Sequence, residues 1–471
     1  MNKIIDTFEK NAERHLDDAA IYFYDGYLQK RTYRDLCRDI DSAIEFLQKK
    51  QVKRGDKVFI FAPVSYRLTV FMIAAFKLGL RVLFIDIHAR QETFKKLFTK
   101  FQPDYAVVSN MTRLLKPFFR ALKRGTKSIN IDKIALGKKS IKVELPDLPD
   151  DEPALLTTTT GSTGLPKIIV RSYEDLSRQL ELINNNLPKL KTTVCMSTSY
   201  IYTFACLVNG HTVVLPPFKL KDKPQKINKS LEKLINVPIS LIITTPVFGL
   251  KARNVFPALE QLYIGGASIN LNEAKKIRSE FASCKLDLVY GATECNIMAH
   301  TSIENYINNL QKDYRSTLGK PFKGVSIRIA EDDSIYVSCN ALIKGFINDK
   351  RDYEYRKIDW YNTNDKGFIE DGQLFYRGKY NYYVEVNGSR YYNHEIEQFI
   401  VTKFSDIKKC AVIQKRQKVY LFLDHKIDGG EIYKAVLDRY GAKLNFRYLR
   451  KIPRDPRHHT KTDYKRLLKI I

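Results

Sequence analysis

Hydrophobic residues recur with helical spacing in Tyr33–Lys49, the first strongly patterned segment of the chain. Leu36, Ile40, Ile44 and Leu47 are separated by three or four positions, with mostly polar residues between them. This spacing puts the apolar side chains on one face of an α-helix. The segment is therefore predicted to be an amphipathic helix that packs on a hydrophobic core.

Two short apolar runs follow, Lys57–Pro63 and Arg81–Ile87, with a helical pattern at Leu68–Leu78 between them. Runs of this length are typical of buried strands, and the strand–helix–strand order is typical of parallel sheets covered by helices. We therefore predict an α/β fold with a large, layered N-terminal α/β domain. Further strand-like runs are Thr212–Leu215, Leu241–Thr245 and Leu259–Ile264.

The pattern changes near Gly378–Asn381, beyond which the chain is more basic and its elements suggest a small α+β unit. We expect a boundary there, between an N-terminal domain of residues 1–378 and a small, mobile C-terminal domain of residues 379–471. With 471 residues, 44% of them hydrophobic, the chain is long enough for one large and one smaller core.

The seven cysteines are scattered and never spaced as C-x-x-C, which argues against a disulfide framework and a structural zinc site. Asp6 and Glu9 come too early for a secretory signal peptide. The most apolar stretch, Val58–Ile87, is interrupted by basic residues and is not suited to span a bilayer. These features predict a soluble, cytoplasmic protein.

Positive charge is in large excess, with a formal net charge of +27. Residues 401–471 alone hold 19 basic and 7 acidic side chains. Such a surface attracts nucleotides, coenzyme A, an acidic carrier protein, anionic lipid or nucleic acid, although a lysine-rich, solvated surface explains it equally well. No zinc-finger, RNP or helix-turn-helix signature accompanies the charge, so we expect no specific nucleic-acid partner. The basic amphipathic run Leu114–Arg124 is either a membrane-surface contact or an ordinary surface helix.

The strongest chemical motif is Thr157–Lys167, T-T-T-T-G-S-T-G-L-P-K. Its glycines let backbone N–H groups approach an anion, its hydroxyls donate, and its lysine supplies a point charge for phosphates. It is not the P-loop pattern, because the lysine follows a proline and no Ser or Thr comes after it. From the residues alone the segment is either a phosphate loop or a polar surface loop.

The G-S-T-G-x-P-K ending resembles the signature loop of the adenylate-forming superfamily, which contains acyl-CoA synthetases, peptide-synthetase adenylation domains and luciferases. The resemblance implies an AMP-forming ligase that uses ATP and Mg²⁺ to convert a carboxylic acid into an acyl-adenylate. Thr160 stands where the family usually has serine, which keeps the hydroxyl. Ile168 stands where it usually has glycine, a change that could slow loop closure. The resemblance assigns ATP binding to Thr159, Gly161, Ser162, Thr163, Gly164 and Lys167, and a catalytic role to Thr160.

Other family motifs follow in the expected order. Y-G-A-T-E at Tyr290–Glu294 implies adenine stacking by Tyr290, a phosphate contact by Thr293, and catalytic Mg²⁺ binding by Glu294, which suits a hard carboxylate. Asp365 matches the aspartate that holds the ribose hydroxyls. Asn364 before it replaces a usual glycine, and Lys379 replaces an arginine, which keeps the charge but loses the planar fork. The remaining expected nucleotide-binding residues of these motifs are Gly265, Gly266, Ala267 and Gly291.

The C-terminal motifs imply a change of conformation between half-reactions. Asn381 matches the hinge, and Gly388 matches the glycine loop that approaches the thiol. Lys461 matches the catalytic lysine that bridges the substrate carboxylate and the α-phosphate. Glu385 departs from the lysine of many thioester-forming members, which puts transfer to coenzyme A in doubt. Glu395 and Glu397 match structural acids.

The acid and the acceptor stay open at this point. Ser197–Phe204 should carry an aromatic gate, and its rings Tyr200, Tyr202 and Phe204 line either a pocket or the core; a fatty or aryl acid fits them. The acceptor is a thiol of coenzyme A or of a phosphopantetheinyl carrier protein. The V-E before Gly388 and the R-H-H-T-K ending also resemble bacterial olefin β-lactone synthetases, in which a β-hydroxy acid's own hydroxyl displaces AMP. A third alternative is a catalytically weak nucleotide-binding relative.

Overall fold

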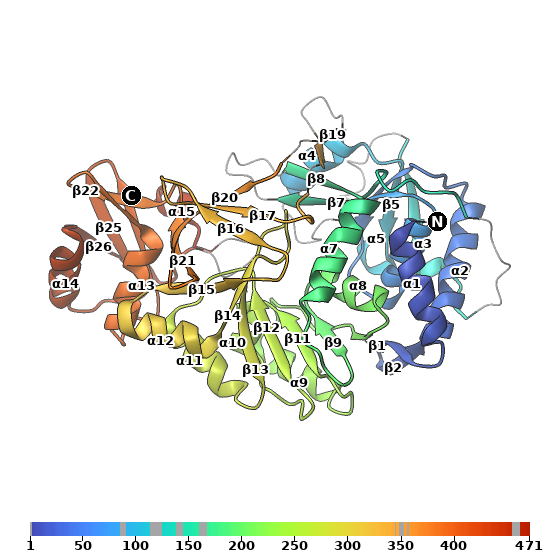
Figure 1. The fold of residues 1–471 in the computed structure, drawn as a ribbon, viewed down its shortest axis with the longest axis horizontal. Coiled ribbons are helices and arrows are strands. Elements are labelled where there is room, and N and C mark those ends of the chain that lie inside the picture. The colour runs from blue at the N-terminus through green and yellow to red at the C-terminus, as the bar shows by residue number, and fades with distance from the viewer. Residues whose placement is uncertain are drawn as a thin grey trace.

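The computed structural model of the protein describes residues 2–84, 91–113, 125–137, 145–159, 167–343, 345–347, 353–355, 358–454 and 462–471. Two large sheets with helices packed on them form the part of the chain before residue 380, and the later elements lie together at one end of the molecule (Figure 1). Within the described residues, no helix is long and apolar enough to span a membrane.

The larger sheet has a parallel core with antiparallel strands at both sides. Its strands are β1 (Ala19–Asp25), β2 (Tyr27–Thr32), β9 (Val194–Ser197), β10 (Thr212–Val214), β11 (Leu241–Thr244), β12 (Gln261–Gly265), β13 (Lys285–Tyr290), β14 (Ala299–Ser302), β15 (Ser316–Pro321), β16 (Ser326–Ile329), β17 (Ser334–Ser338), β20 (Tyr361–Glu370) and β21 (Gln373–Lys379). From β1 the parallel order is β10, β9, β11, β12 and β13. From β13 onward, β14, β15, β21, β20, β17 and β16 continue the sheet antiparallel.

The second sheet is parallel in the order β6, β5, β3, β4, β7 and continues antiparallel through β8, β18 and β19. Its strands are β3 (Lys57–Phe61), β4 (Arg81–Phe84), β5 (Tyr105–Val108), β6 (Lys127–Asn130), β7 (Pro153–Thr159), β8 (Lys167–Ser172), β18 (Gly345–Ile347) and β19 (Tyr353–Tyr355). Strands β7 and β8 are antiparallel neighbours, and Thr159 at the end of β7 is the register partner of Lys167 at the start of β8. Residues 160–166 of the phosphate motif therefore connect two neighbouring strands.

The helices of this part pack on the sheets through apolar faces. They are α1 (Lys3–Arg14), α2 (Tyr33–Lys49), α3 (Tyr66–Lys77), α4 (Gln91–Phe101), α5 (Asn110–Arg113), the 3₁₀ turn η1 (Ile131–Lys133), α7 (Tyr173–Asn185), α8 (Tyr200–Val208), α9 (Pro224–Glu232), α10 (Pro246–Lys251), α11 (Leu271–Glu280) and α12 (Ile303–Asp313).

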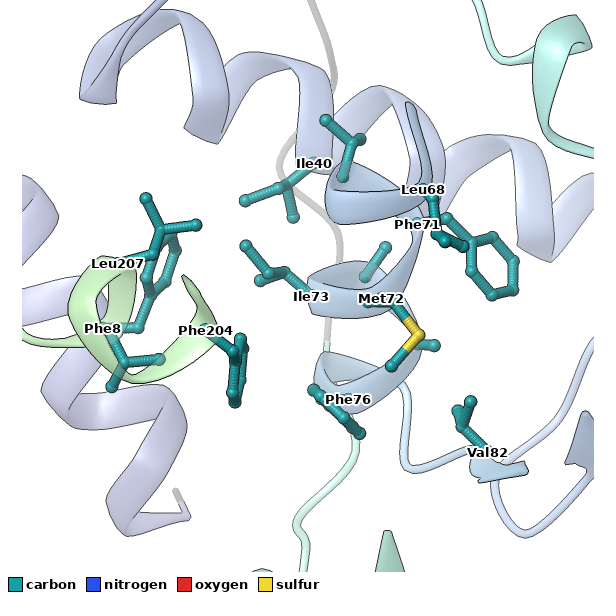
Figure 2. Close-up of a cluster of buried hydrophobic side chains, with 14 of the residues drawn as sticks. Phe8, Ile40, Leu68, Phe71, Met72, Ile73, Phe76, Val82, Phe204 and Leu207 are labelled. Atoms are coloured by element: carbon teal, nitrogen blue, oxygen red, sulfur yellow. The ribbon is translucent and has the colours of Figure 1, made fainter. Parts of the chain in front are cut away.

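Helix α3 lies at the centre of the core. Ser65 caps it, its hydroxyl accepting from the Leu68 N–H, and its side chains are apolar on nearly every face because other elements surround it. Figure 2 shows Phe76 of α3 beside Phe204 of α8, with ring centroids 5.3 Å apart. Burial of each such side chain contributes about 1.5–3 kcal/mol.

The sequence-based elements agree with this fold. The predicted helix Tyr33–Lys49 is α2, and the predicted strand–helix–strand unit is β3, α3 and β4, with β3 and β4 parallel. The three further strand-like runs correspond to β10, β11 and β12, each shifted by no more than two residues at either end. The prediction of an α/β fold with a large layered domain is confirmed.

The elements after residue 382 form two small sheets and their own core, in agreement with the predicted α+β composition. They are β22 (Tyr383–Val386), β23 (Ser389–Tyr392), α13 (Asn393–Lys403), β24 (Cys410–Lys415), β25 (Lys418–Leu423), α14 (Gly430–Tyr440), β26 (Leu444–Tyr448) and α15 (Tyr464–Leu467). Helix α13 contacts the first part of the chain: His394 Nε2 lies 2.9 Å from Ser316 Oγ, and Gln398 donates to the carbonyl of Ile269. The boundary at residue 378 and the mobility of this unit stay predictions.

Candidate active site

The Asp365 carboxylate brings together three of the predicted binding residues. Tyr290, the last residue of β13, donates its hydroxyl to Asp365 Oδ2 at 2.8 Å. Lys379 at the end of β21 is the register partner of Asp365, and its Nζ lies 2.5 Å from Oδ1. Asp365 is only 6% exposed. Burial, followed by the Asp365 charge, raises the pKa of Tyr290 well above its ordinary value, so the phenol stays a donor.

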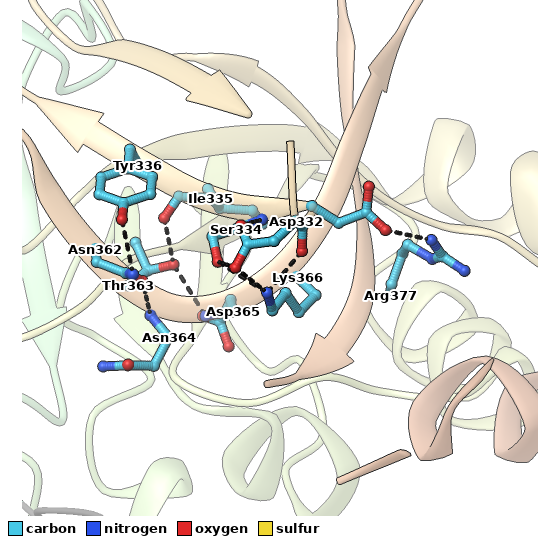
Figure 3. A network of polar contacts seen from close by, with 11 residues as sticks. Asp332, Ser334, Ile335, Tyr336, Asn362, Thr363, Asn364, Asp365, Lys366 and Arg377 are labelled. Atoms are coloured by element: carbon cyan, nitrogen blue, oxygen red, sulfur yellow. Dashed lines mark hydrogen bonds and ion pairs between the residues drawn. The ribbon is translucent and has the colours of Figure 1, made fainter. Parts of the chain in front are cut away.

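A bulge in strand β20, where the backbone turns sharply at Asn364, presents this carboxylate (Figure 3). The N–H of Asn364 donates to Asn362 Oδ1 at 2.8 Å, and the N–H of Asp365 donates to Thr363 Oγ1 at 3.1 Å. Thr363 in turn donates to the carbonyl of Ile335 on β17. Asn364 has φ +57°, a left-handed conformation that glycine adopts freely and that asparagine tolerates better than most residues. The departure from the family's glycine therefore preserves the turn.

The same network braces the strands around the turn. Lys366, buried with 7% exposed, donates to Asp332 Oδ2 at 2.8 Å and to Ser334 Oγ at 2.9 Å. Its ammonium lowers the pKa of Asp332 to about 2. Arg377 pairs with Asp333 at 2.6 Å and with Glu395 of α13 at 2.8 Å, so it joins β21 to the C-terminal elements. Sequence reasoning missed Arg377, because nothing local to R-G-K distinguishes it from a surface arginine.

Two of the expected glycines occupy positions that exclude other residues. A Cβ added to Gly291 would lie 1.9 Å from the carbonyl oxygen of Asn296, so only glycine fits directly after Tyr290. Gly266 has φ +93°, which strains any side chain. Gly265 ends β12 beside Val289 of β13, and Ala267 follows in the bend. The Gly-Gly-Ala segment therefore lies beside the strand that carries Tyr290.

Thr293 and Glu294 are linked to the strand that follows the phosphate motif. Arg171 of β8 donates from Nη2 to the carbonyl of Thr293 at 2.9 Å. Tyr361 lies close to Glu294: burial, then the charge of Glu294, raises its pKa. Sequence reasoning missed Arg171. Its signal was an arginine ending an otherwise apolar strand pattern, I-I-V-R, directly after the motif.

Several predicted residues lie outside the described part of the chain. These are Thr160, Gly161, Ser162, Thr163, Gly164 and Lys461, together with the side chains of Thr159 and Lys167 and the run Leu114–Arg124. The backbones of Thr159 and Lys167 face each other as a register pair. Ile168, next along β8, is fully buried in a core cluster. It therefore anchors the strand by packing.

The structure describes the C-terminal candidate residues other than Lys461, together with the residues that follow Lys461. Asn381 is exposed, in a turn closed by the Tyr382 N–H and the Lys379 carbonyl at 3.1 Å. Gly388, with φ +79°, follows Asn387 at the tip of the β22–β23 hairpin, where Glu385 lies 3.5 Å from Arg390. Beyond Lys461, the Tyr464 hydroxyl donates to both oxygens of Glu397, at 2.8 and 2.9 Å. Burial raises the pKa of Glu397 to about 8.

The predicted aromatic gate divides between two environments. Phe204 is buried in the core against Phe76, so it is a core residue. Tyr200 stacks on Phe84 with centroids 5.7 Å apart, and both it and Tyr202 are only partly buried. Of the three rings of the segment, these two tyrosines are the ones that are not fully buried in the core.

These residues fit ATP and Mg²⁺ by their chemistry. The Asp365 carboxylate accepts a hydrogen bond from Tyr290 at Oδ2 and forms an ion pair with Lys379 at Oδ1, and it keeps lone pairs for hydroxyl donors. The described residues hold no preformed group of three or more potential metal ligands. A lone Glu294 suits Mg²⁺, which takes one or two carboxylates plus substrate phosphates. When bound, the ion would neutralise phosphate charge.

The chain is similar to several known proteins in sequence and in fold. Residues 8–342 match the family described as AMP-binding enzyme. A D-alanine--D-alanyl carrier protein ligase of Staphylococcus aureus is 25% identical over 403 residues, covering 81% of this chain and 79% of that protein. An amide bond synthetase from Marinactinospora thermotolerans has a TM-score of 0.82 at 16% identity, covering 99% of both chains. An o-succinylbenzoate CoA synthetase from Bacillus subtilis has a TM-score of 0.79 at 17% identity, covering 98% of this chain and 97% of that one.

The two solved structures share the fold over nearly the whole length of the chain, and the family match covers most of it. The predicted superfamily, fold class and acid-activating ligase function are thereby confirmed. The chain belongs to the AMP-binding enzyme family, as an adenylate-forming ligase.

Proposed function

We propose that the chain uses ATP to activate an apolar carboxylic acid, fatty or aryl, and passes the acyl group to a thiol. The observation that carries the proposal is the buried Asp365 carboxylate with Tyr290 and Lys379 on it, in a member of the AMP-binding family. An aromatic ring beside a buried acid suits adenosine, because the ring stacks on the base while the carboxylate accepts from the ribose hydroxyls.

In this proposal the residues divide the work between two half-reactions. Lys167 and the loop hydroxyls hold the phosphates while Lys461 orients the acid. Glu294 would hold Mg²⁺, which would neutralise phosphate charge. A carboxylate oxygen attacks the α-phosphorus in line, and pyrophosphate leaves with the electron pair of the broken P–O bond. The C-terminal unit then turns about Asn381. The thiol loses its proton to solvent, its sulfur attacks the acyl carbon, and AMP leaves with the electron pair of the broken acyl C–O bond.

The acid is proposed to be apolar although relatives of this chain activate D-alanine. A buried ammonium group needs a carboxylate partner, since an unpaired buried charge is costly. Residues 197–204, the segment expected to carry the aromatic gate, contain no charged residue. Tyr200 and Tyr202, its two half-buried rings, suit a hydrocarbon or aromatic acid.

The acceptor is proposed to be coenzyme A or an acidic carrier protein. The excess of basic residues in 401–471 favours a polyanionic partner. The relatives named as carrier protein ligases support the carrier protein. The described cysteines are free thiols, which supports a reducing, cytoplasmic setting for a thiol substrate.

The test is a panel of carboxylic acids incubated with ATP and Mg²⁺, with and without coenzyme A, and read by mass spectrometry. An acyl-CoA product confirms the thiol acceptor and identifies the acid. An acyl-adenylate that accumulates in both conditions points to a carrier protein. A dehydrated product from a β-hydroxy acid without coenzyme A would replace the thiol proposal with β-lactone synthesis. Activation of D-alanine alone would refute the apolar substrate.

A further inference from the structure

Arg171 is a charged residue that the proposed reaction leaves without a role. It lies on β8, four residues after the lysine of the phosphate motif, beside β7 and α7 (Figure 1). Among the arginines of the described segments, it alone is buried, with 3% exposed. Burial lowers its pKa to about 10, while the charges of Glu294 and Asp175 act in the opposite direction, so the guanidinium stays charged at neutral pH.

The guanidinium binds in three directions. Nη1 donates to Thr157 Oγ1 at 2.6 Å, and Thr157 is on β7, at the start of the phosphate motif. Nη2 donates to the carbonyl of Thr293 at 2.9 Å. Nε donates to Gln179 Oε1 of α7 at 2.9 Å. One planar group thus connects the strand before the motif with the segment that carries Glu294.

The connection continues to the other side of Glu294. Gln179 donates from Nε2 to the carbonyl of Ala341 at 3.2 Å. Two residues later, the N–H of Ile343 donates to the carbonyl of Glu294 at 3.0 Å. The backbone of Glu294 is therefore held on both sides, by Arg171 through Thr293 and by the 341–343 segment that Gln179 anchors.

We propose that Arg171 is a positioning residue for ATP·Mg²⁺, which fixes Glu294, the carboxylate proposed to bind Mg²⁺, relative to Thr157 at the start of the phosphate motif. The inference rests on the proposed function, which places the phosphates on the motif and the ion on Glu294. Fork geometry is what the role requires, because a lysine ammonium at the end of a flexible chain does not reach Thr157, Gln179 and Thr293 along fixed directions. Arg171 touches neither the acyl group nor the thiol in this scheme.

The test compares Arg171→Lys and Arg171→Gln with Arg178→Gln, a control arginine of α7 that pairs with Glu174 at the surface. ATP·Mg²⁺ affinity is measured without acid, by titration with a fluorescent ATP analogue. We expect ATP·Mg²⁺ binding to weaken by at least about tenfold in both Arg171 variants, because each loses at least one hydrogen bond of the charged guanidinium. The KM for the acid and the rate of thiol transfer from a preformed acyl-adenylate should stay within about twofold of wild type, a split that a merely structural residue would not produce.

Thr157→Val keeps the inference falsifiable if the Arg171 variants do not fold, because it removes only the hydroxyl that Nη1 contacts. It should weaken ATP·Mg²⁺ binding by about threefold to tenfold without changing thiol transfer. Unchanged ATP·Mg²⁺ affinity in the folded variants, or an equal fall in adenylation and thiol transfer, overturns the inference. A wild-type protein that binds no ATP refutes the proposed function, whereas wild-type binding with unaffected variants refutes the role of Arg171 alone.

Discussion

Replacing Tyr290 with phenylalanine removes one oxygen atom from the centre of the candidate site and leaves the aromatic ring in place. The Asp365 carboxylate then loses the 2.8 Å hydrogen bond to Oδ2 and keeps only the Lys379 ammonium at Oδ1. Since the ring is retained, any loss of nucleotide affinity reports on the carboxylate and its contact with the ribose. Lys379→Met removes the ion pair at Oδ1 and keeps the hydrogen bond from Tyr290 at Oδ2.

The two partners of Asp365 should differ in importance. A hydrogen bond to a buried charged group contributes about 1.5–3 kcal/mol, equivalent to roughly 10- to 150-fold in affinity if the carboxylate must be held for ribose binding. The Lys379 side chain is 44% exposed, so water screens its ion pair despite the short contact of 2.5 Å. Such a pair contributes about 1 kcal/mol or less, equivalent to roughly fivefold. Tyr290→Phe is therefore expected to weaken ATP·Mg²⁺ binding more than Lys379→Met.

Titration calorimetry of ATP·Mg²⁺ against the single variants, the double variant and Tyr380→Phe measures this order. Tyr380 is 41% exposed in the neighbouring turn, so its phenylalanine variant is a matched control expected to bind like wild type. The binding free energy lost in the double variant should differ from the sum of the two single losses, because both partners act on one carboxylate. Equal affinities for wild type and Tyr290→Phe, or a larger loss in Lys379→Met, would refute the reasoning.

Three further predictions concern stability and the half-reactions. Burial lowers the pKa of His394 to about 4, so the imidazole is neutral in the folded protein and gains a proton on unfolding below about pH 6.5. The stability that the neutral imidazole allows is therefore complete above pH 6.5 and is lost as the pH falls towards 4, by at most about 2 kcal/mol at pH 5. Thermal unfolding at pH 7 and pH 5 should show a larger fall for wild type than for His394→Asn, and parallel curves would contradict this. Gly291→Ala forces the backbone away from the Asn296 carbonyl, at a cost of about 1–3 kcal/mol or more, and should lower both the Tm and the ATP affinity; an unchanged Tm would contradict the close approach. Lys461→Ala should abolish acyl-adenylate formation and retain thiol transfer from a preformed acyl-adenylate, measured in separate half-reaction assays; an equal loss of both would refute two conformations.

The fold was largely predictable because its local patterns and its tertiary packing agree. The apolar face of α2 and the continuous apolar runs of β3 and β4 are the surfaces that the structure buries. Short runs between helical patterns leave few alternatives to a parallel sheet. The grouping of Tyr290, Asp365 and Lys379 followed from the family resemblance, and the structure brings these three residues together.

Contacts between distant parts of the chain could not be read from the sequence in the same way. Arg171 and Thr293 are joined across 122 positions, and no local pattern indicates which carbonyl a buried arginine will bind. Likewise, the scattered cysteines gave no sign of a pair, yet Cys295 and Cys339 lie with their sulfurs 3.1 Å apart, next to Glu294. The first contact joins β8 of the second sheet to the segment after β13 of the larger sheet, and the second joins the segments that follow β13 and β17. Both therefore depend on how strands distant in the sequence are placed in three dimensions.

The departures from the family motifs decide between an active ligase and a weak nucleotide-binding relative. Ile168 packs in the core and Asn364 adopts the conformation its turn requires, so neither disrupts the site. Lys379 is different, because its ammonium pairs with Asp365 and lacks the second fixed N–H edge that an arginine would offer to a ribose oxygen. This change should raise the KM for ATP and spare kcat, since Glu294 and Lys461 are assigned the chemistry.

Lys379→Arg tests that distinction. A guanidinium can pair with Asp365 through one edge and reach a ribose oxygen through another, so the variant should bind ATP about threefold to tenfold more tightly, with kcat unchanged. The measurement is ATP–pyrophosphate exchange across the acid panel, with Lys320→Arg, at an exposed position of β15, as a control for an added guanidinium group. If Lys379→Arg gains no affinity and neither protein exchanges pyrophosphate with any acid, the weak relative becomes the better description, because the departures would then extend to the chemistry itself.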